Sequence, residues 1–212
     1  MNPQRPGVLF MVSAPSGAGK TSLLAALMKR SANLAVSISH TTRARRGNEE
    51  NGVNYHFVDV PTFSRMVSDG AFLEHADVFG NYYGTALSSV EGPLAAGTDL
   101  ILEIDWQGAQ QVRRLIPAAI GIFILPPDRA TLEQRLRSRG EDRDDVIRQR
   151  LSKAVEEMSH CTEYDYLVVN DDFERATNDL IAIVRAERLK RAPQAAALGP
   201  RLSALLDTSS AA

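Results

Sequence analysis

A strand, a glycine-rich loop and a helix follow one another near the start of the chain, and they constrain its fold more than any other feature. The apolar run at residues 8–12 leads directly into Ala14-Pro-Ser-Gly-Ala-Gly-Lys-Thr21, and residues 22–30 carry leucines at helical spacing. This order is typical of a phosphate-binding loop, although Ala14 stands where the general pattern has glycine. The alternative is a glycine-rich turn that binds no ligand.

The residue types in this loop suit a polyphosphate and its metal ion. Gly17 and Gly19 permit backbone conformations in which successive N–H groups turn inward on a phosphate. The N-terminal dipole of the following helix adds to that attraction. Lys20 can reach the outer phosphates, and the hydroxyl of Thr21 can ligate Mg²⁺.

Composition and charge predict a globular protein of the cytoplasm. The chain has 212 residues, of which 44% are apolar and 24% charged, so we expect one domain with inserted pieces or at most two small domains. The formal charge of −2 argues against a dedicated surface for nucleic acid or an anionic membrane. Cys161 is the only cysteine, which excludes an internal disulfide and fits a reducing compartment. We also expect neither a signal peptide nor a membrane-spanning segment.

Strands and helices alternate in the second half of the chain, which predicts an α/β fold with a parallel sheet and ligands at the carboxyl ends of the strands. We expect strands at residues 99–105, 120–125 and 166–169, and helices at residues 107–115, 128–139, 146–158 and 173–191. Together with the first strand and helix they predict a core made of residues 1–34 and 91–212.

The region between these parts does not alternate strands with helices, and we interpret residues 35–90 as a strand-rich insertion. Its expected strands cover residues 34–40, 53–60 and 72–79, and its expected helices cover residues 61–67 and 87–96. The tail at about residues 192–212 is rich in Ala, Pro and Gly, and we expect it to be loosely ordered. Self-association through its leucines is the alternative, so a monomer and a homo-oligomer both stay open.

Two arginines on a polar loop of the insertion are candidates for gripping a phosphate. Arg43 and Arg46 lie close in sequence to the hydroxyl donors of Ser39 and Tyr55. The planar fork of a guanidinium matches the oxygens of a phosphate. A solvated basic loop explains these arginines equally well.

Glu74 lies on a predicted half-buried strand of the insertion, where a carboxylate is costly unless it has a partner. Facing inward, it could accept two N–H groups from guanine, at N1 and at the exocyclic amine, a pair that adenine does not offer. Thr85 could then donate to the guanine O6. Such a site rejects the wrong base because its buried polar groups would stay unpaired. A structural ion pair is the alternative.

Two further groups of charged residues suit phosphoryl transfer. Glu103 and Asp105 share one face near the end of a buried strand, where acids hold Mg²⁺ through water or orient a substrate. A second group surrounds Gly140, with Arg135, Arg139, Arg143 and Arg150 among acidic residues. We interpret about residues 136–150 as a mobile lid whose arginines close on the transferring group. A charged helical hairpin on the surface is the alternative.

Five motifs in one order make the chain resemble the bacterial guanylate kinase family: Ser13-Ala-Pro-Ser-Gly-Ala-Gly-Lys-Thr-Ser22, Ser39-His-Thr-Thr-Arg43, Asn81-Tyr-Tyr-Gly-Thr85, Ile104-Asp-Trp-Gln-Gly-Ala109 and Val169-Asn-Asp-Asp172. The likeness covers about residues 7–191. It implies a P-loop core of three layers with an inserted nucleoside-monophosphate-binding subdomain and a helical lid. It also implies transfer of the ATP γ-phosphoryl group to GMP with Mg²⁺, in purine nucleotide metabolism.

The resemblance also assigns roles to individual residues. GMP would be bound by Ser39, Arg43, Arg46, Tyr55, Glu74, Tyr83, Thr85 and Asp105. ATP would be bound by Ala14, Pro15, Ser16, Gly17, Ala18, Gly19, Lys20, Thr21 and Ser22, with Asn170 near the adenine. Catalysis would fall to Lys20, Arg43, Arg139 and Arg150, and Thr21 would ligate Mg²⁺. The family often has Asp where this chain has Glu103, which leaves the role of Glu103 open beside that of Asp105.

Three other functions compete with this interpretation. A guanylate-kinase-like interaction module would lack the phosphate loop or the lid arginines, and this chain has both. A kinase for another small molecule could share the core, since a fold does not determine its substrate. A P-loop switch or motor ATPase would not need an acceptor pocket in the insertion.

Overall fold

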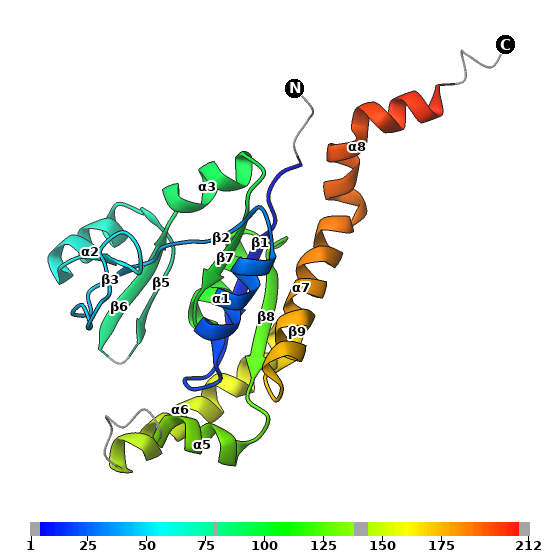
Figure 1. Ribbon diagram of the computed structural model, residues 1–212. Coiled ribbons are helices and arrows are strands. Elements are labelled where there is room, and N and C mark those ends of the chain that lie inside the picture. Colours follow the sequence, from blue (N-terminus) through cyan, green and yellow to red (C-terminus); the bar gives the residue numbers. More distant parts are fainter. Residues whose placement is uncertain (1–4, 79, 138–143, 208–212) are drawn as a thin grey trace.

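The computed structural model describes residues 5–78, 80–137 and 144–207 (Figure 1). Its centre is a five-stranded sheet in the order β2-β7-β1-β8-β9, and every neighbouring pair is parallel. The strands are β1 (Leu9–Ser13), β2 (Leu34–Val36), β7 (Asp99–Glu103), β8 (Ile120–Leu125) and β9 (Tyr166–Val169). The predicted α/β fold with a parallel sheet is confirmed.

Alternating side chains of β1 divide the core into two apolar layers, one on each face of the sheet. Phe10 and Val12 pack with α1 (Lys20–Arg30) and α7 (Phe173–Leu189). Leu9 and Met11 pack on the opposite face with α3 (Ser88–Ala95) and α4 (Trp106–Leu115). The core therefore has the expected three layers, with the sheet buried between helices.

A second sheet of four strands, in the order β4-β3-β6-β5, forms the strand-rich part at the left of Figure 1. Its strands are β3 (His40–Thr41), β4 (His56–Phe57), β5 (Phe72–Val78) and β6 (Asn81–Ala86). Helix α2 (Val60–Ser68) covers it through Phe63, which packs on Phe72 and Ala86. Asp59 caps this helix by accepting a hydrogen bond from the N–H of Thr62.

Two strand predictions in this region were wrong. Residues 34–40 do not form one strand, because β2 pairs with β7 in the core sheet whereas β3 pairs with β4 and β6. The strand expected at residues 53–60 shrinks to β4. Its first half is a turn instead, in which the N–H groups of Val53 and Asn54 are bonded locally to the carbonyl of Glu50.

Two helices below the core carry the predicted lid. They are α5 (Arg129–Arg137) and α6 (Asp144–Ser159), and they pack through Leu132, Leu136 and Ala154. A short 3₁₀ turn, His160–Glu163, links α6 to the core. Residues 138–143 lie outside the described part of the chain.

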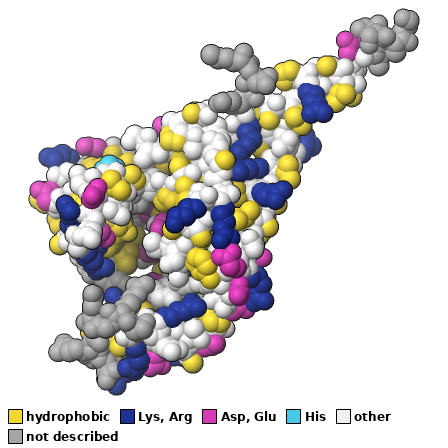
Figure 2. Space-filling view, viewed as in Figure 1, with side chains coloured by type: hydrophobic (Ala, Val, Ile, Leu, Met, Phe, Trp, Pro, Cys, Tyr) yellow, Lys and Arg dark blue, Asp and Glu magenta, His cyan; other side chains and the backbone are white. Residues whose placement is uncertain are grey.

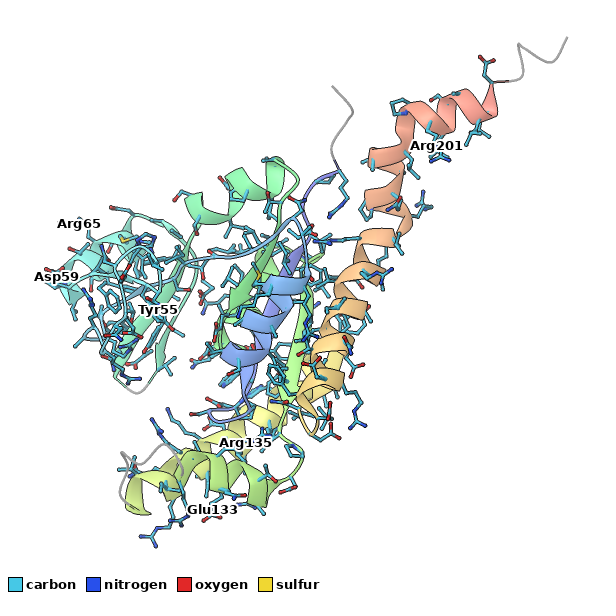
Figure 3. All side chains as sticks on the ribbon, in the orientation of Figure 1. Tyr55, Asp59, Arg65, Glu133, Arg135 and Arg201 are labelled. Atoms are coloured by element: carbon cyan, nitrogen blue, oxygen red, sulfur yellow. The ribbon has the colours of Figure 1, made fainter. Side chains whose placement is uncertain are left out.

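The expectation of a loosely ordered tail was wrong for residues 191–206. They form α8 (Arg191–Leu206), which continues from α7 and projects away from the body, with Arg201 near its far end (Figures 1 and 3). Alanine is the strongest helix former, and Pro193 stands in the first turn, where it removes no helical hydrogen bond. None of the helices in the described ranges combines the length and the apolar character that crossing a membrane requires.

Candidate active site

A cavity of about 340 Å³ lies where the carboxyl ends of β1 and β7 face the inserted sheet. Figure 2 shows the molecule hollowed between these two parts. Open parallel sheets bind ligands at this edge, as the sequence predicted. The cavity brings together predicted residues from separate parts of the chain: Ala14, Pro15, Ser16, Gly17, Gly19, Lys20, Thr21, Ser22, Ser39, Tyr55, Glu74, Tyr83, Glu103 and Asp105.

The phosphate loop depends on two glycines with left-handed backbones. Gly17 has a φ of 90° and Gly19 a φ of 91°, which side chains rarely adopt. A Cβ on Gly19 would also lie 2.5 Å from Nδ2 of Asn170. Ala14 needs no such freedom, because among the described non-glycine residues only Asn33 has a positive φ. The departure from the general pattern at this position is therefore compatible with the loop.

Asn170, the residue after β9, supports the phosphate loop from behind. Its Nδ2 donates to the carbonyl oxygen of the fully buried Ala18 at 2.7 Å. Arg135 on α5 approaches the same pair, since its guanidinium donates to the carbonyl of Asn170 at 3.2 Å (Figure 3). These contacts hold the loop open to the cavity. The placement of Asn170 near an adenine stays a prediction.

Lys20 and Thr21 of the phosphate loop contact the carboxyl end of β7. Nζ of Lys20 lies 3.9 Å from Oε1 of Glu103, and the hydroxyl of Thr21 donates to the same oxygen at 3.0 Å. Asp105 follows the strand and caps α4, accepting a hydrogen bond from the N–H of Gly108 at 2.9 Å. Hydroxyl and carboxylate oxygens are the ligands that Mg²⁺ prefers. Within the described residues no three His, Cys, Asp or Glu side chains cluster as a metal site, so an ion here would take further oxygens from phosphate and water.

Arg43 is held inside the inserted part by an acid. Its guanidinium donates to both carboxylate oxygens of Glu49, at 3.0 and 2.7 Å, and it lies over the ring of Tyr55. The ion pair raises the pKa of Arg43 and lowers that of Glu49. The guanidinium is therefore charged and oriented, but it is engaged with a carboxylate in this structure.

A smaller adjoining cavity of about 200 Å³ gathers the other predicted arginines. Arg43 and Arg46 line it from the inserted part, and Arg150 lines it from α6. Tyr83 lines both cavities, so the two are adjacent. Arg139 lies outside the described residues.

Glu74 is a buried carboxylate with a hydroxyl partner. Its side chain is only 3% exposed, and Thr85 donates to Oε1 at 2.6 Å. Ser39 extends this contact, with its Oγ 3.5 Å from the hydroxyl of Thr85. Burial is the largest influence on Glu74 and raises its pKa to about 7. None of the described residues forms an ion pair with Glu74, so the structural ion pair is not what the structure shows.

A break in strand register directs this side chain. The pairing of β5 with β6 shifts between Phe72 and Glu74, and Phe72, Leu73 and Glu74 are all buried in succession. A bulge of this kind re-aims side chains that regular alternation would send to opposite faces. Glu74 thereby reaches the cavity, while Leu73 joins the apolar layer of α3 and α4.

Comparison with known proteins identifies the family of this site. The sequence profile described as guanylate kinase matches residues 6–187. The chain belongs to the guanylate kinase family. It is 56% identical to the guanylate kinase of Methylococcus capsulatus over 200 residues, which cover 94% of this chain and 98% of that protein. It is 57% identical to that of Alcanivorax borkumensis over 200 residues, which cover 94% and 97%.

A solved structure extends the likeness to three dimensions. The crystal structure of guanylate kinase from Anaplasma phagocytophilum superposes with a TM-score of 0.74 at 37% identity, covering 90% of each chain. The P-loop core and its inserted part therefore follow the guanylate kinase fold.

In this member of the guanylate kinase family, one charged residue lines the larger cavity without having been predicted from the sequence. Glu157 on α6 accepts a hydrogen bond from the N–H of Ser16 in the phosphate loop at 3.2 Å. Burial raises the pKa of this carboxyl. Helical spacing could have indicated Glu157, because Arg150, Lys153 and Glu157 share one face of α6.

Proposed function

We propose that this protein is an ATP:GMP phosphotransferase that moves the γ-phosphoryl group of ATP to GMP and forms ADP and GDP. The observation that carries the proposal is the presence of the phosphate loop and the buried carboxylate of Glu74 in one cavity. Membership of the guanylate kinase family supports the same reaction. ATP and GMP are accordingly the proposed substrates, and the cytoplasm is the proposed site of action.

Glu74 and Thr85 form the proposed base-reading pair. The ionised carboxylate accepts the two N–H groups that guanine presents side by side, whereas adenine offers an unprotonated ring nitrogen at the first of these positions. The single hydroxyl proton of Thr85 points to Glu74 in the free protein at 2.6 Å. On binding, this hydroxyl rotates and donates to the guanine O6, with Asp105 nearby in the cavity that Glu74 lines.

The phosphate of GMP is assigned to the hydroxyls and arginines between the two cavities: Ser39, Arg43, Arg46, Tyr55 and Tyr83. Arg43 exchanges one charged partner for another in this step, because its fork leaves the carboxylate of Glu49 and takes up the phosphate oxygens. The exchange costs less than exposing a bare guanidinium would, because an oxyanion is available in both states.

Transfer needs alignment and charge neutralisation more than it needs a protein base. The attacking oxygen belongs to a phosphate that is already ionised at neutral pH. Lys20 supplies positive charge in the larger cavity and Arg150 in the smaller one, with Arg139 assigned the same role from the lid. Closing α5 and α6 toward the inserted sheet excludes water, which would otherwise hydrolyse ATP.

Mg²⁺ fits the oxygens at the end of β7. The hydroxyl of Thr21 is the proposed direct ligand, and Glu103 and Asp105 would hold the ion through water. When bound, the ion neutralises charge on the phosphates of ATP.

A coupled assay of ADP formation tests the proposal, with ATP and Mg²⁺ present and GMP, AMP, CMP and UMP offered in parallel. Turnover with GMP alone is expected. Turnover with another monophosphate instead of GMP would contradict the base-reading role of Glu74 and Thr85. A folded protein that turns over none of the four would contradict the kinase itself.

A further inference from the structure

We propose that Gly108 and Gln111, on one face of α4, position the carboxylate of Glu74 and thereby set the selectivity for GMP. The inference rests on the proposed function, in which Glu74 reads the guanine. Both residues contact β5 and neither lines the described cavity, so they are positioning residues. No motif or charge pattern in the sequence pointed to this role.

Gly108 provides a contact that no other residue type allows. A Cβ at this position would lie 2.5 Å from Oε2 and 3.1 Å from Cδ of Glu74. Such distances are shorter than van der Waals contact, so the carboxylate rests directly against the backbone of the third residue of α4. Oε1 is engaged by Thr85 at 2.6 Å, which leaves Oε2 to be positioned by Gly108.

Gln111 fixes the strand that carries Glu74. Its Nε2 donates to the carbonyl oxygen of His75 at 2.7 Å, and its Oε1 accepts from the N–H of His75 at 3.1 Å. β5 is the edge strand of the inserted sheet, so these main-chain groups face away from β6. One amide side chain therefore satisfies a donor and an acceptor that the edge would otherwise expose to water.

Helix α4 is itself anchored in the core. Ala109 and Val112 are buried in the apolar layer beneath the central sheet, one residue along from Gly108 and Gln111. The two faces of the helix thus join the rigid core to the strand that carries Glu74. Asp105 completes the link, since it accepts the N–H of Gly108 and also lines the cavity.

The decisive substitution is Gly108→Ala. Its methyl group meets the end of a flexible side chain and not the backbone, so the protein folds while the carboxylate of Glu74 moves. The KM for GMP is expected to rise by about tenfold or more, because misplacing a recognition group by about 1 Å can cost up to about 10² in rate. The KM for ATP is expected to stay within about twofold of the original value.

A second substitution tests the other contact between α4 and β5 and introduces no steric clash. Gln111→Ala removes both hydrogen bonds to His75 and is expected to raise the KM for GMP by about fivefold, the equivalent of one net hydrogen bond. The matched control is the neighbouring Gln110→Ala, since Gln110 bonds to Glu163 and not to the inserted sheet. Gly92→Ala is the control for the glycine, because a Cβ there meets nothing within 4 Å.

A double-mutant cycle with Glu74→Ala shows whether Gly108 acts through that carboxylate. Gly108→Ala should raise the KM for GMP in the original protein and have no further effect once Glu74 is absent. An equal loss in both backgrounds, or a Gly108→Ala protein with the original KM for GMP, would overturn the positioning role. If Glu74→Ala alone leaves GMP use unchanged, the proposed base reading fails as well, so the two failures are distinguishable.

Discussion

The two halves of the active-site cavity are built in different ways. The phosphate loop is one continuous segment, and its shape comes from the left-handed backbones of Gly17 and Gly19. The acceptor side is assembled from separate elements: Glu74 comes from β5, Thr85 from β6, Ser39 from the segment before β3, and Asp105 from the cap of α4. One half is a property of local chain geometry, and the other exists only after distant segments meet.

The difference also appears in electrostatics. The loop side presents N–H dipoles and the Lys20 ammonium, with Glu103 3.9 Å from Nζ of Lys20 and Glu157 bonded to the N–H of Ser16. The acceptor side contains a buried carboxyl whose pKa is raised to about 7 and an arginine already paired with Glu49. Both sides therefore exchange a carboxylate contact for a ligand, and the acceptor side in addition depends on the protonation of Glu74. Substitutions in the two halves should separate ATP effects from GMP effects.

The largest expected effect is on the loop side. Lys20→Ala should lower kcat by about 10³-fold or more, since it removes a fixed positive charge from the transferring phosphoryl group. Steady-state kinetics with both substrates measures the loss. Lys29→Ala is the matched control, because Lys29 is exposed at the far end of the same helix. A Lys20→Ala enzyme with the original kcat would remove the loop from the chemistry.

The next effect belongs to the acceptor side. Glu74→Ala should lower kcat/KM for GMP by about 10²-fold and weaken the preference over AMP, because it removes the acceptor for two N–H groups. The KM for ATP should change little. Competition between GMP and AMP in one assay measures the preference directly, and an unchanged ratio would contradict base reading by this residue.

A pH profile sharpens the electrostatic contrast. Glu74 must be ionised to accept from guanine, and its pKa of about 7 means that kcat/KM for GMP should fall by about fourfold between pH 8 and 6.5. The Glu74→Ala enzyme controls for titration of GMP itself and should lack this component. A profile that is identical in both enzymes would show that the Glu74 carboxyl does not titrate in this range.

The same shift acts on folding stability with the opposite sign. The carboxyl has a pKa of about 7 in the folded protein against 4.5 in the unfolded chain, so the folded state binds the proton more readily. The contribution of Glu74 to stability is therefore gained as pH falls through about 7 toward 4.5 and lost as pH rises again. In denaturant titrations, the free energy of unfolding of the original protein should increase from pH 8 to pH 6 relative to that of the Glu74→Ala protein.

The smallest change in kinetics should come from Asn170, which supports the phosphate loop from behind. Asn170→Ala removes the hydrogen bond to the carbonyl of Ala18 and should raise the KM for ATP by about threefold to tenfold, the range of a single net hydrogen bond. The KM for GMP should not change, because Asn170 does not line the acceptor cavity. An equal rise in both values would mean that the two halves are coupled through the core.

Much of the core could be predicted from the sequence because its signals are local. β8 and β9 begin and end where their apolar runs predicted, and the loop and α1 follow from a strand, glycines and helical spacing. The predictions that were wrong fall where strand pairing in three dimensions overrides the local alternation of apolar residues. Residues 34–40 were predicted as one alternating strand, but residues 34–36 pair in the core sheet and only His40, at the other end, pairs in the inserted sheet.

The sequence by itself determined the phosphate loop and the alternation of strands and helices in the core, because each depends on neighbours along the chain. Only the tertiary structure decided that Glu157 reaches the loop, that Glu49 holds Arg43 at 2.7 Å, and that Gly108 supports Glu74. Periodicity indicates which face of an element is buried but not which distant side chain it meets. The proposed selectivity for GMP depends on the last of these contacts, which the packing of α4 against β5 brings about.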